Sequence, residues 1–263
     1  MSYALVAVWS GGNSMSHSHD AAARFRTLHE RGFFILPNAW DRGSAVRLAA
    51  LGFKAIASTS SGAAWAMGKS DGELTRDEVL RHLRMLVSAT DLPVNADFEN
   101  GFADSPADLA ANVTLALETG VAGLSIEDWS GSAMYDRGHA VERLAAARAA
   151  IDALNPDVML IGRNENFRIP DMTASSSIAR AVAYAAAGAD CLFVPMIADH
   201  GAVAELVAAV APKPVNVLVH DYDERIAGFA ALGVRRCSIG GSLARICWDA
   251  FDHAALRLKA CAP

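Results

Sequence analysis

The sequence predicts an α/β protein of the (β/α)₈ TIM-like barrel class, and three observations support this prediction. From Phe33 onward, short apolar and β-branched runs alternate with Ala-rich stretches of helical periodicity. The alternation recurs eight times at intervals of about 25–30 residues, which suits a barrel of roughly 250 residues. Several helical stretches end in a glycine, the usual stop signal. A doubly wound open sheet is the alternative, but no Gly-x-Gly-x-x-Gly turn follows the first strand.

The predicted strands are continuous apolar runs, as expected for parallel strands that helices cover. They lie at residues 33–37, 55–59, 94–98, 123–127, 159–163, 191–194, 215–219 and 236–239. The predicted helices lie at residues 43–51, 75–89, 106–119, 141–154, 175–187, 202–210 and 224–232. A final apolar stretch at 246–256 is compatible with a helix that packs on its own barrel or is exchanged with a neighbouring subunit.

The length of 263 residues suits a single barrel domain, which we expect at residues 24–263. No composition shift or Pro/Ser-rich linker divides this range. Residues 1–23 are expected to be a flexible N-terminal extension. The part before Met15 is expected to be a loose tail or the product of an upstream start codon. No Lys or Arg precedes Arg24, so the first apolar run is not expected to be a signal peptide.

Composition narrows the class of partner. The formal net charge of −6 and the pI near 5.7 argue against nucleic acid or an anionic membrane as a partner. No apolar run approaches the roughly 20 residues that span a bilayer. The cysteines form no CxxC pair, which favours a reducing, cytoplasmic compartment; they are Cys191, Cys237, Cys247 and Cys261.

Acidic residues follow two neighbouring strands of the predicted barrel. Asp97 and Glu99 are two residues apart, so on a continuing strand both face the same side. Glu127, at the end of the next strand, adds a third carboxylate. A hard divalent cation such as Mg²⁺ would relieve their mutual repulsion. The alternative is a solvated strand end, or carboxylates that pair with arginine.

Other polar residues also lie at predicted strand ends. Arg163 suits a substrate carboxylate or phosphonate, or is a structural partner of the carboxylates, and both roles are compatible. Asn216 lies in an apolar strand and needs a partner, either substrate or neighbouring main chain. The small residues at 58–64 suit either an anion or an ordinary tight turn. Asp71, considered alone, is a turn residue.

From about Arg24 to Leu256 the chain resembles the isocitrate lyase/phosphoenolpyruvate mutase superfamily. The order and strand-end placement of the matching segments make the resemblance specific. These segments are Leu-Pro-Asn-Ala-Trp-Asp at 36–41, Ser-Ser-Gly-Ala at 60–63, Asp-Gly-Glu at 71–73, Ala-Asp-Phe-Glu-Asn-Gly at 96–101, Ile-Glu-Asp at 126–128, Arg163, and Ala-Asp-Cys-Leu-Phe-Val-Pro at 189–195.

The resemblance implies a TIM-like barrel, often tetrameric, whose last helix is exchanged between subunits. It implies a Mg²⁺ ion, with Mn²⁺ as the other candidate, held by Asp97 directly and by Asp71, Glu99 and Glu127 largely through water. A 2-oxo-carboxylate group would bridge the metal, Arg163 and the main chain of Ser61, Gly62 and Ala63. Trp40 would line the pocket and Asn216 would meet the distal end of the substrate. The catalytic residues implied are Asp71, Glu127 and Arg163.

Departures from the family pattern narrow the activity. The loop at 128–136 has no Cys, Lys or His, which argues against a standard isocitrate lyase. No lysine occurs between Lys69 and Lys213, which weakens the phosphonomutase assignment. Met196 stands where the lyases have a Glu, and Glu99 where an Asp is usual. Ser130 and Tyr135 are candidate proton carriers, although ordinary loop roles suit both.

The sequence therefore predicts a Mg²⁺-dependent lyase that acts on a small anionic 2-oxo or 2-hydroxy dicarboxylate, by C–C cleavage or decarboxylation through an enolate. We expect a homo-oligomer, either a dimer or a tetramer. One alternative is a phosphonomutase or P–C hydrolase that acts on phosphonopyruvate or a relative, similar to carboxyvinyl-carboxyphosphonate phosphorylmutase. The other is a barrel that binds a 2-oxo acid without converting it.

Overall fold

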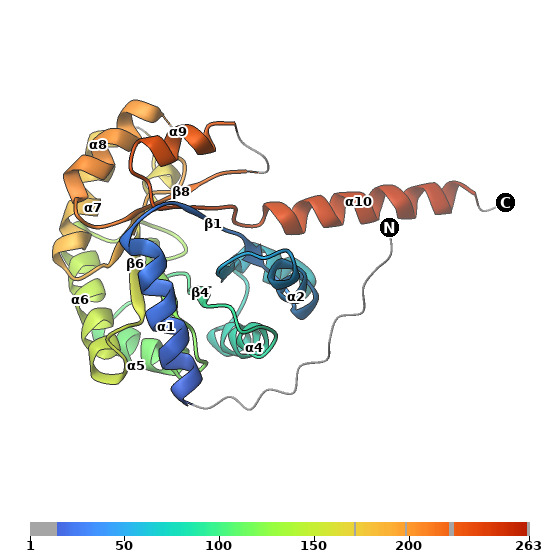
Figure 1. Ribbon diagram of the computed structural model, residues 1–263, viewed down its shortest axis with the longest axis horizontal. Helices are drawn as coiled ribbons and strands as arrows, with labels where there is room; N and C mark the ends of the chain where they lie inside the picture. Colours follow the sequence, from blue (N-terminus) through green and yellow to red (C-terminus); the bar gives the residue numbers. More distant parts are fainter. Residues whose placement is uncertain (1–14, 171, 198, 221–223, 262–263) are drawn as a thin grey trace.

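The computed structural model describes residues 15–170, 172–197, 199–220 and 224–261, and the side chains of this range from residue 20 onward (Figure 1). The tail expected at residues 1–14 lies outside the described residues.

Parallel strands form a barrel that closes on itself. The strand order is β1-β9-β8-β7-β6-β5-β4-β3-β2. β1 pairs with β9 and β2 pairs with β3, and only Pro37 separates β1 from β2. The two short strands therefore act as one interrupted strand, and the predicted (β/α)₈ barrel is confirmed. The strands are β1 (Phe34–Leu36), β2 (Asn38–Ala39), β3 (Ile56–Ser58), β4 (Val94–Asp97), β5 (Gly123–Glu127), β6 (Met159–Arg163), β7 (Cys191–Phe193), β8 (Val215–Leu218) and β9 (Arg236–Ser238).

Helices follow the strands, and several of them begin at a residue whose side chain caps the helix. Thr75 and Glu78 form a capping box at the start of α4, and Ser105 caps α5 immediately before Pro106. The predicted helices are all present, with ends that differ by a few residues. The helices are α1 (Met15–Glu30), α2 (Arg42–Ala50), α3 (Ser60–Ala66), α4 (Arg76–Val87), α5 (Pro106–Leu117), α6 (Arg137–Leu154), the 3₁₀ turn η1 (Asn166–Arg168), α7 (Ala174–Ala186), α8 (His200–Val210), α9 (Ile226–Ala231) and α10 (Ser242–Ala260).

Helix α1 covers the end of the barrel where the strands begin. Arg24 donates to the carbonyl of Asp91, and Arg26 donates to the carbonyl of Pro156 and to Asp190. The ring of the fully buried Phe25 fills the space that a side chain at Gly123 would need. The domain boundary expected at residue 24 thus falls inside a helix that starts at Met15. This helix packs against the barrel through the buried Phe25.

The interior of this barrel is unusually polar. TIM-barrel interiors are ordinarily filled by branched apolar side chains. Here one cavity is lined by buried polar residues from several strands, namely Ser58, Asn95, Ser125, Asn216, Arg236 and Ser238. The apolar core lies instead between the strands and the surrounding helices, where Leu83, Leu109 and Leu124 are fully buried. A polar interior that opens to a cavity is suited to binding a small polar molecule.

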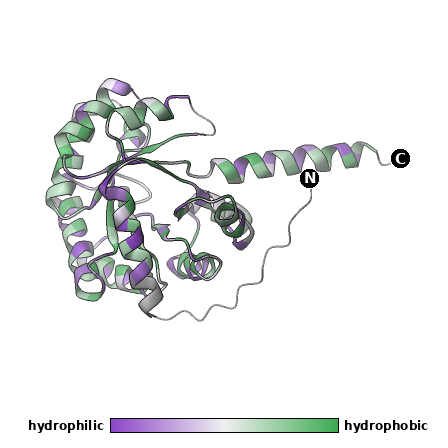
Figure 2. Ribbon diagram, viewed as in Figure 1, coloured by the Kyte–Doolittle hydropathy of each residue, from purple (hydrophilic) through white to green (hydrophobic). Residues whose placement is uncertain are grey.

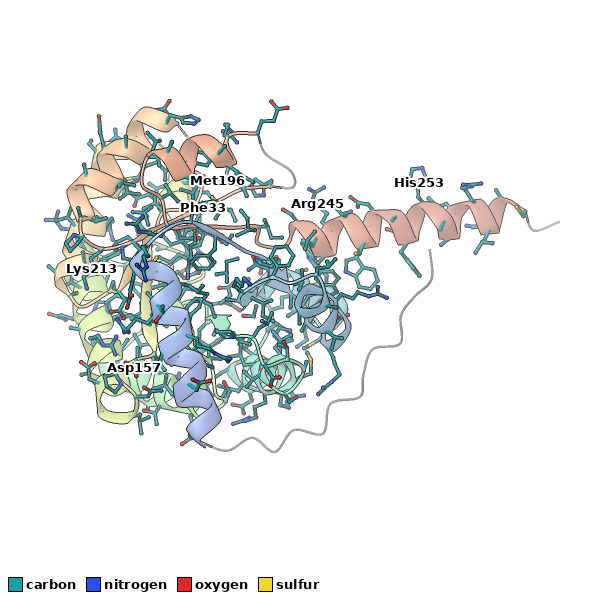
Figure 3. All side chains as sticks on the ribbon, in the orientation of Figure 1. Phe33, Asp157, Met196, Lys213, Arg245 and His253 are labelled. Carbon is teal, nitrogen blue, oxygen red and sulfur yellow. The ribbon has the colours of Figure 1, made fainter. Side chains whose placement is uncertain are left out.

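Helix α10 extends away from the barrel (Figures 1 and 3). Its residues are exposed from Arg245 onward, including the large apolar side chains of Trp248, Phe251, Leu256 and Leu258. Apolar and polar residues alternate along it (Figure 2). No helix in the described ranges is long and apolar enough to cross a membrane.

Candidate active site

Three neighbouring strands place charged residues at the same end of the barrel. Asp97 is the last residue of β4, Glu127 of β5 and Arg163 of β6. Glu127 and Arg163 are register partners in adjacent strands. Since the C-terminal ends of barrel strands carry the active site in enzymes of this fold, this end is the candidate site. Asp97 and Glu127 both contact Arg163, as in the alternative in which Arg163 is a structural partner of the carboxylates.

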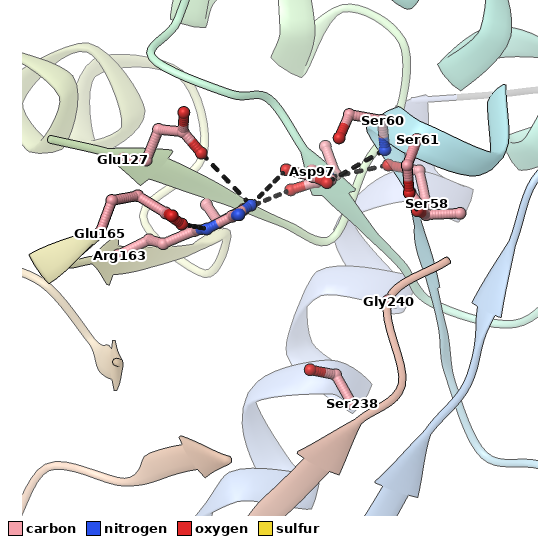
Figure 4. A network of polar contacts seen from close by, with 12 residues as sticks. Ser58, Ser60, Ser61, Asp97, Glu127, Arg163, Glu165, Ser238 and Gly240 are labelled. Carbon is pink, nitrogen blue, oxygen red and sulfur yellow. Dashed lines mark hydrogen bonds and ion pairs between the residues drawn. The ribbon is translucent and has the colours of Figure 1, made fainter. Parts of the chain in front are cut away.

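The Arg163 guanidinium lies among three carboxylates (Figure 4). Its Nη1 is 3.1 Å from Asp97 Oδ1 and 3.3 Å from Glu127 Oε2, and its Nε donates to Glu165 Oε1. Burial alone would lower the pKa of Arg163, but Glu127, Glu165 and Asp97 raise it well above the ordinary value. Arg163 therefore stays charged, and the expected pairing with Glu127 and Asp97 is present.

Asp97 is held by hydrogen bonds with the end of β3 and with the segment that follows it. The Ser60 N–H donates to Asp97 Oδ2 at 3.1 Å, and the Asp97 N–H donates to Ser58 Oγ at 2.7 Å. Ser60 begins α3, a short helix capped by Thr59. The turn expected around residues 58–64 is thus mainly the first part of a helix, because Thr59 accepts a hydrogen bond from the N–H of Gly62.

Two cavities meet at this end of the barrel and share Ser60, Asp71 and Arg163. The inner cavity, of about 160 Å³, is also lined by Ser61, Asp97 and Asn216. The outer cavity, of about 470 Å³, is lined by the side chains that surround the entrance. These include Glu99, Glu127, Trp129, Ser130 and Arg168. The structure thus brings Asp71, Asp97, Glu99, Glu127 and Arg163 around two cavities that share lining residues.

Other predicted residues lie elsewhere or have protein partners. Trp40, Gly62 and Ala63 are not among the residues that line these two cavities. A Cβ at Gly62 would lie 2.9 Å from Trp40 Cβ and 2.7 Å from Thr59 Cγ2, so packing requires the glycine. Asn216 lines the inner cavity, but its amide already bonds Ser238 and Arg236. Their predicted roles toward substrate stay predictions.

Glu99 has an unusual environment for a carboxylate. Its backbone φ is 48°, in the left-handed region, and its buried Oε1 has no hydrogen-bond partner among the described residues. Burial first, and then the charges of Asp97 and Asp71, raise its pKa to about 7. Burial likewise raises the pKa of Glu127 to about 8. Both side chains would be stabilised as carboxylates by a nearby cation.

The acidic residues fit a hard divalent cation in their chemistry. Their donors are carboxylate oxygens, and one of these, Glu99 Oε1, is buried without a partner. Among the described residues, no three Asp, Glu, His or Cys side chains converge on one point as a complete metal site. Mg²⁺ is usually bound through one or two carboxylates and several waters, so a dispersed set of this kind still suits it.

A buried network behind the site includes residues that sequence reasoning missed. Glu165 is fully buried and accepts from Arg163 and, at 3.0 Å, from Arg168. Asp128 accepts from the Glu165 N–H at 2.8 Å and from Tyr184, and burial raises its pKa. The sequence feature that could have identified Glu165 is its position, since it is an acidic residue two places after Arg163 in the strand-end segment 163–166.

The two candidate proton carriers are placed differently. Ser130 lines the outer cavity, and its Oγ closes a turn with the main chain of Ala133 at 2.8 Å. The Tyr135 hydroxyl donates to Asp104 and accepts from Asn100 at 3.3 Å, and Tyr135 lines neither cavity. Ser130 is therefore the better placed of the two.

Comparisons with known proteins agree with this architecture. The family model described as phosphoenolpyruvate phosphomutase matches residues 25–259. A crystal structure of a candidate lyase/mutase from Burkholderia cenocepacia J2315 is 43% identical, with a TM-score of 0.88 over 93% of this chain and 89% of that one.

The relatives that are similar in sequence include an uncharacterized protein and a lyase. Uncharacterized protein Rv1998c of Mycobacterium tuberculosis is 37% identical over 82% of this chain and 81% of its own length. The 2-methylisocitrate lyase of Escherichia coli is 33% identical over 56% of this chain and 52% of its own length. The chain therefore belongs to the phosphoenolpyruvate phosphomutase family, within the isocitrate lyase/phosphoenolpyruvate mutase superfamily of lyases and mutases.

Proposed function

We propose that this protein is a Mg²⁺-dependent lyase that cleaves a C–C bond, or removes CO₂, next to the carbonyl or hydroxyl carbon of a small dicarboxylate. The observation that carries the proposal is the contact of Arg163 with carboxylates from neighbouring strand ends, beside two cavities that it lines. A charged guanidinium attracts an anionic substrate, and carboxylate oxygens supply ligands for a metal.

Arg163 would bind and orient the substrate carboxylate. It lines both cavities, so a ligand in either can contact it. Glu165 and Asp97 hold it from two directions, which restricts the rotation of the guanidinium before substrate arrives. A group held in place in this way loses little further freedom when it binds.

Asp97 would hold the metal ion directly, with Asp71, Glu99 and Glu127 contacting it largely through its waters. When bound, Mg²⁺ would stabilise the negative charge that develops on the enolate oxygen. The Ser60 N–H orients the Asp97 carboxylate through its hydrogen bond to Oδ2, and Ser58 Oγ accepts from the Asp97 main-chain N–H. Ser130, which lines the outer cavity beside Trp129, would carry a proton at its Oγ.

We also propose that a second copy of the chain covers α10. Trp248 and Phe251 pack edge to face on this helix, yet Phe251 is 62% exposed. Exposed apolar residues in such number on one projecting helix are typical of a subunit interface. An exchanged helix would bury them without any change to the barrel.

The test is a turnover screen followed by NMR. Oxaloacetate, 2-methylisocitrate, 2,3-dimethylmalate and phosphonopyruvate are each incubated with purified protein, with and without Mg²⁺. The proposal expects loss of a dicarboxylate only when Mg²⁺ is present, and at least a hundredfold slower loss with Asp97→Asn. Asp108→Asn, on α5 away from the cavities, is the matched control and should react at the wild-type rate.

Other results would contradict the proposal in distinct ways. Conversion of phosphonopyruvate alone, seen as a new ³¹P signal, would establish P–C chemistry instead. Binding of dicarboxylates by calorimetry without conversion of any compound would establish a binding barrel. Turnover that is unaffected by chelation or by Asp97→Asn would place the reaction outside this site.

A further inference from the structure

A second arginine, Arg236, lines the inner cavity of the barrel, and among the described residues it forms no ion pair with the carboxylates of the candidate active site. Arg236 is the first residue of β9 and is 2% exposed. Arg236 is the register partner of Asn216 in β8. Asn216 is the register partner of Phe193 in β7, and Phe193 is that of Arg163 in β6. Since register partners in parallel strands face the same side, this row runs along the inner wall of the barrel from one arginine to the other.

The groups that contact Arg236 are all uncharged. Its Nε donates to Asn216 Oδ1 at 3.1 Å, its Nη1 lies 3.2 Å from His29 Nε2, and its guanidinium lies 5.8 Å from the ring centre of Phe25. The Phe25 carbonyl, 2.8 Å from His29 Nδ1, can only accept, so Nδ1 carries the hydrogen and Nε2 accepts from Arg236.

Among the described residues, none in contact with Arg236 carries a negative charge. Burial, followed by the charge of Arg236, lowers the pKa of His29 to about 3, so this ring is neutral at pH 7. Burial raises the pKa of the Cys191 thiol, which therefore also stays neutral. Across the described ranges no carboxylate forms an ion pair with Arg236, whereas Arg163 has three. A buried cation of this kind ordinarily has a counter-charge.

The cavity provides space and further hydrogen-bond donors beside Arg236. Arg236 lines the inner cavity together with Asn95, Ser125 and Ser238. Ser238 Oγ accepts from Asn216 at 2.9 Å, which leaves its own hydrogen free to donate. The volume of about 160 Å³ is far above the roughly 15 Å³ that one water requires.

We propose that Arg236 and Ser238 form an anion-binding site inside the barrel. The ligand is a small monoanion or one carboxylate group of an organic acid, held by the guanidinium and the hydroxyl. The site neutralises Arg236 and makes the inner end of the cavity selective for anions. This inference stands on the uncompensated charge of Arg236 and does not depend on the proposed lyase activity.

Bromide is the first probe because its anomalous scattering identifies it. Crystals grown in bromide should show an anomalous peak within hydrogen-bonding distance of Arg236. In solution, bromide at constant ionic strength, balanced with a large sulfonate anion, should raise the melting temperature in a saturable way. Arg236→Met should weaken bromide binding more than tenfold, while Arg235→Met, which removes the neighbouring outward-facing cation, should leave it unchanged.

Competition between malonate and bromide identifies the source of the anion. If the ligand is a free monoanion, malonate should leave the bromide peak in place. If it is a carboxylate of an organic acid, malonate should displace bromide competitively. A wild-type protein with no anomalous peak and no saturable response to bromide, formate or malonate would overturn the proposal. If Arg236→Met does not fold, Ser238→Ala serves as the second variant, because it keeps the charge of Arg236. It should weaken bromide binding several-fold. The anomalous peak in the wild-type protein tests the site without any variant.

Discussion

Arg163 Nη1 lies 3.1 Å from Asp97 Oδ1, and this contact joins β6 to β4 across the intervening strand β5. The two residues are 66 positions apart in the chain, and the parallel pairing of β4 with β5 and of β5 with β6 brings them together. The same nitrogen lies 3.3 Å from Glu127, which ends β5. One guanidinium thus contacts the acidic residues at the ends of three neighbouring strands, namely Asp97, Glu127 and Glu165, and fixes their positions relative to one another.

Replacement of this guanidinium should therefore cost activity even when the charge is kept. Arg163→Lys has one nitrogen and cannot contact Asp97, Glu127 and Glu165 together. We expect kcat/KM on the substrate found in the screen to fall about 100-fold, which corresponds to about 2.7 kcal/mol. Arg26→Lys, at an ion pair with Asp190 on the opposite end of the barrel, is the control. An equal loss in both variants would indicate a general effect on folding.

The orphaned oxygen of Glu99 leads to a prediction about metal. Glu99→Gln keeps the shape of the side chain but removes the charge, so we expect the Mg²⁺ concentration for half-maximal activity to rise more than tenfold. Chelation should abolish wild-type turnover, and added Mg²⁺ should restore it. Glu205→Gln, on the exposed side of α8, should need the same Mg²⁺ concentration for half-maximal activity as the wild-type protein. Unchanged Mg²⁺ dependence in Glu99→Gln would exclude Glu99 as a ligand.

Acid should destabilise the protein through His29. Its pKa of about 3 in the folded chain lies below the ordinary 6.5, so the unfolded chain binds the additional proton between these values. The stabilising contribution is complete above pH 6.5 and is lost as the pH falls toward 3, by about 1.4 kcal/mol per pH unit.

Urea unfolding at pH 7, 6, 5 and 4 measures this dependence. His29→Gln keeps a donor for Phe25 and an acceptor for Arg236 but cannot take up the proton. The slope of unfolding free energy against pH should therefore be smaller in the variant by about 1.4 kcal/mol per unit. His253→Gln, on the exposed part of α10, is the control. Equal slopes in wild type and His29→Gln would contradict the buried neutral ring.

Two glycines with similar backbone angles should respond differently to a methyl group. Gly101 has φ of +76° and an added Cβ would lie 2.0 Å from Leu109 Cδ1, whereas Gly131 has φ of +96° and open space around it. Gly101→Ala should lower the unfolding free energy by about 3 kcal/mol, since strain and overpacking add. Gly131→Ala should cost only about 1 kcal/mol. Similar costs in calorimetry would show that Leu109 moves aside.

The exposed face of α10 predicts self-association. Phe251→Asp places a charge on this apolar helix, and light scattering during gel filtration should show a shift toward the monomer. His253→Asp adds the same charge on the same helix, at a residue that is polar in the natural chain. It should leave the assembly intact. A wild-type protein that is monomeric at micromolar concentration would contradict the proposed exchange of α10.

Local patterns were sufficient for most of the secondary structure. Apolar runs such as 123–127 and 159–163 match β5 and β6 in full, because strand burial and helix termination are encoded within a few residues. Helix α3 was not predicted, since its Ser/Gly/Ala composition also suits a turn, and contacts with Trp40 and Ala244 decide its conformation. Helix α1 was missed because its polar N-terminal half has no apolar periodicity, while Phe25 gains stability only from the barrel it plugs.

The sequence by itself determined the barrel class, the family and the strand-end placement of Asp97, Glu127 and Arg163, because each of these depends on order and spacing along the chain. The tertiary structure alone decided the partners of each charge. Glu165 pairs with Arg163 while Arg236 is left with the neutral His29 and Asn216, and nothing in local sequence distinguishes the two arginines. The physical reason is that Coulomb interaction and desolvation depend on distance and burial, which barrel closure sets between residues far apart in the chain.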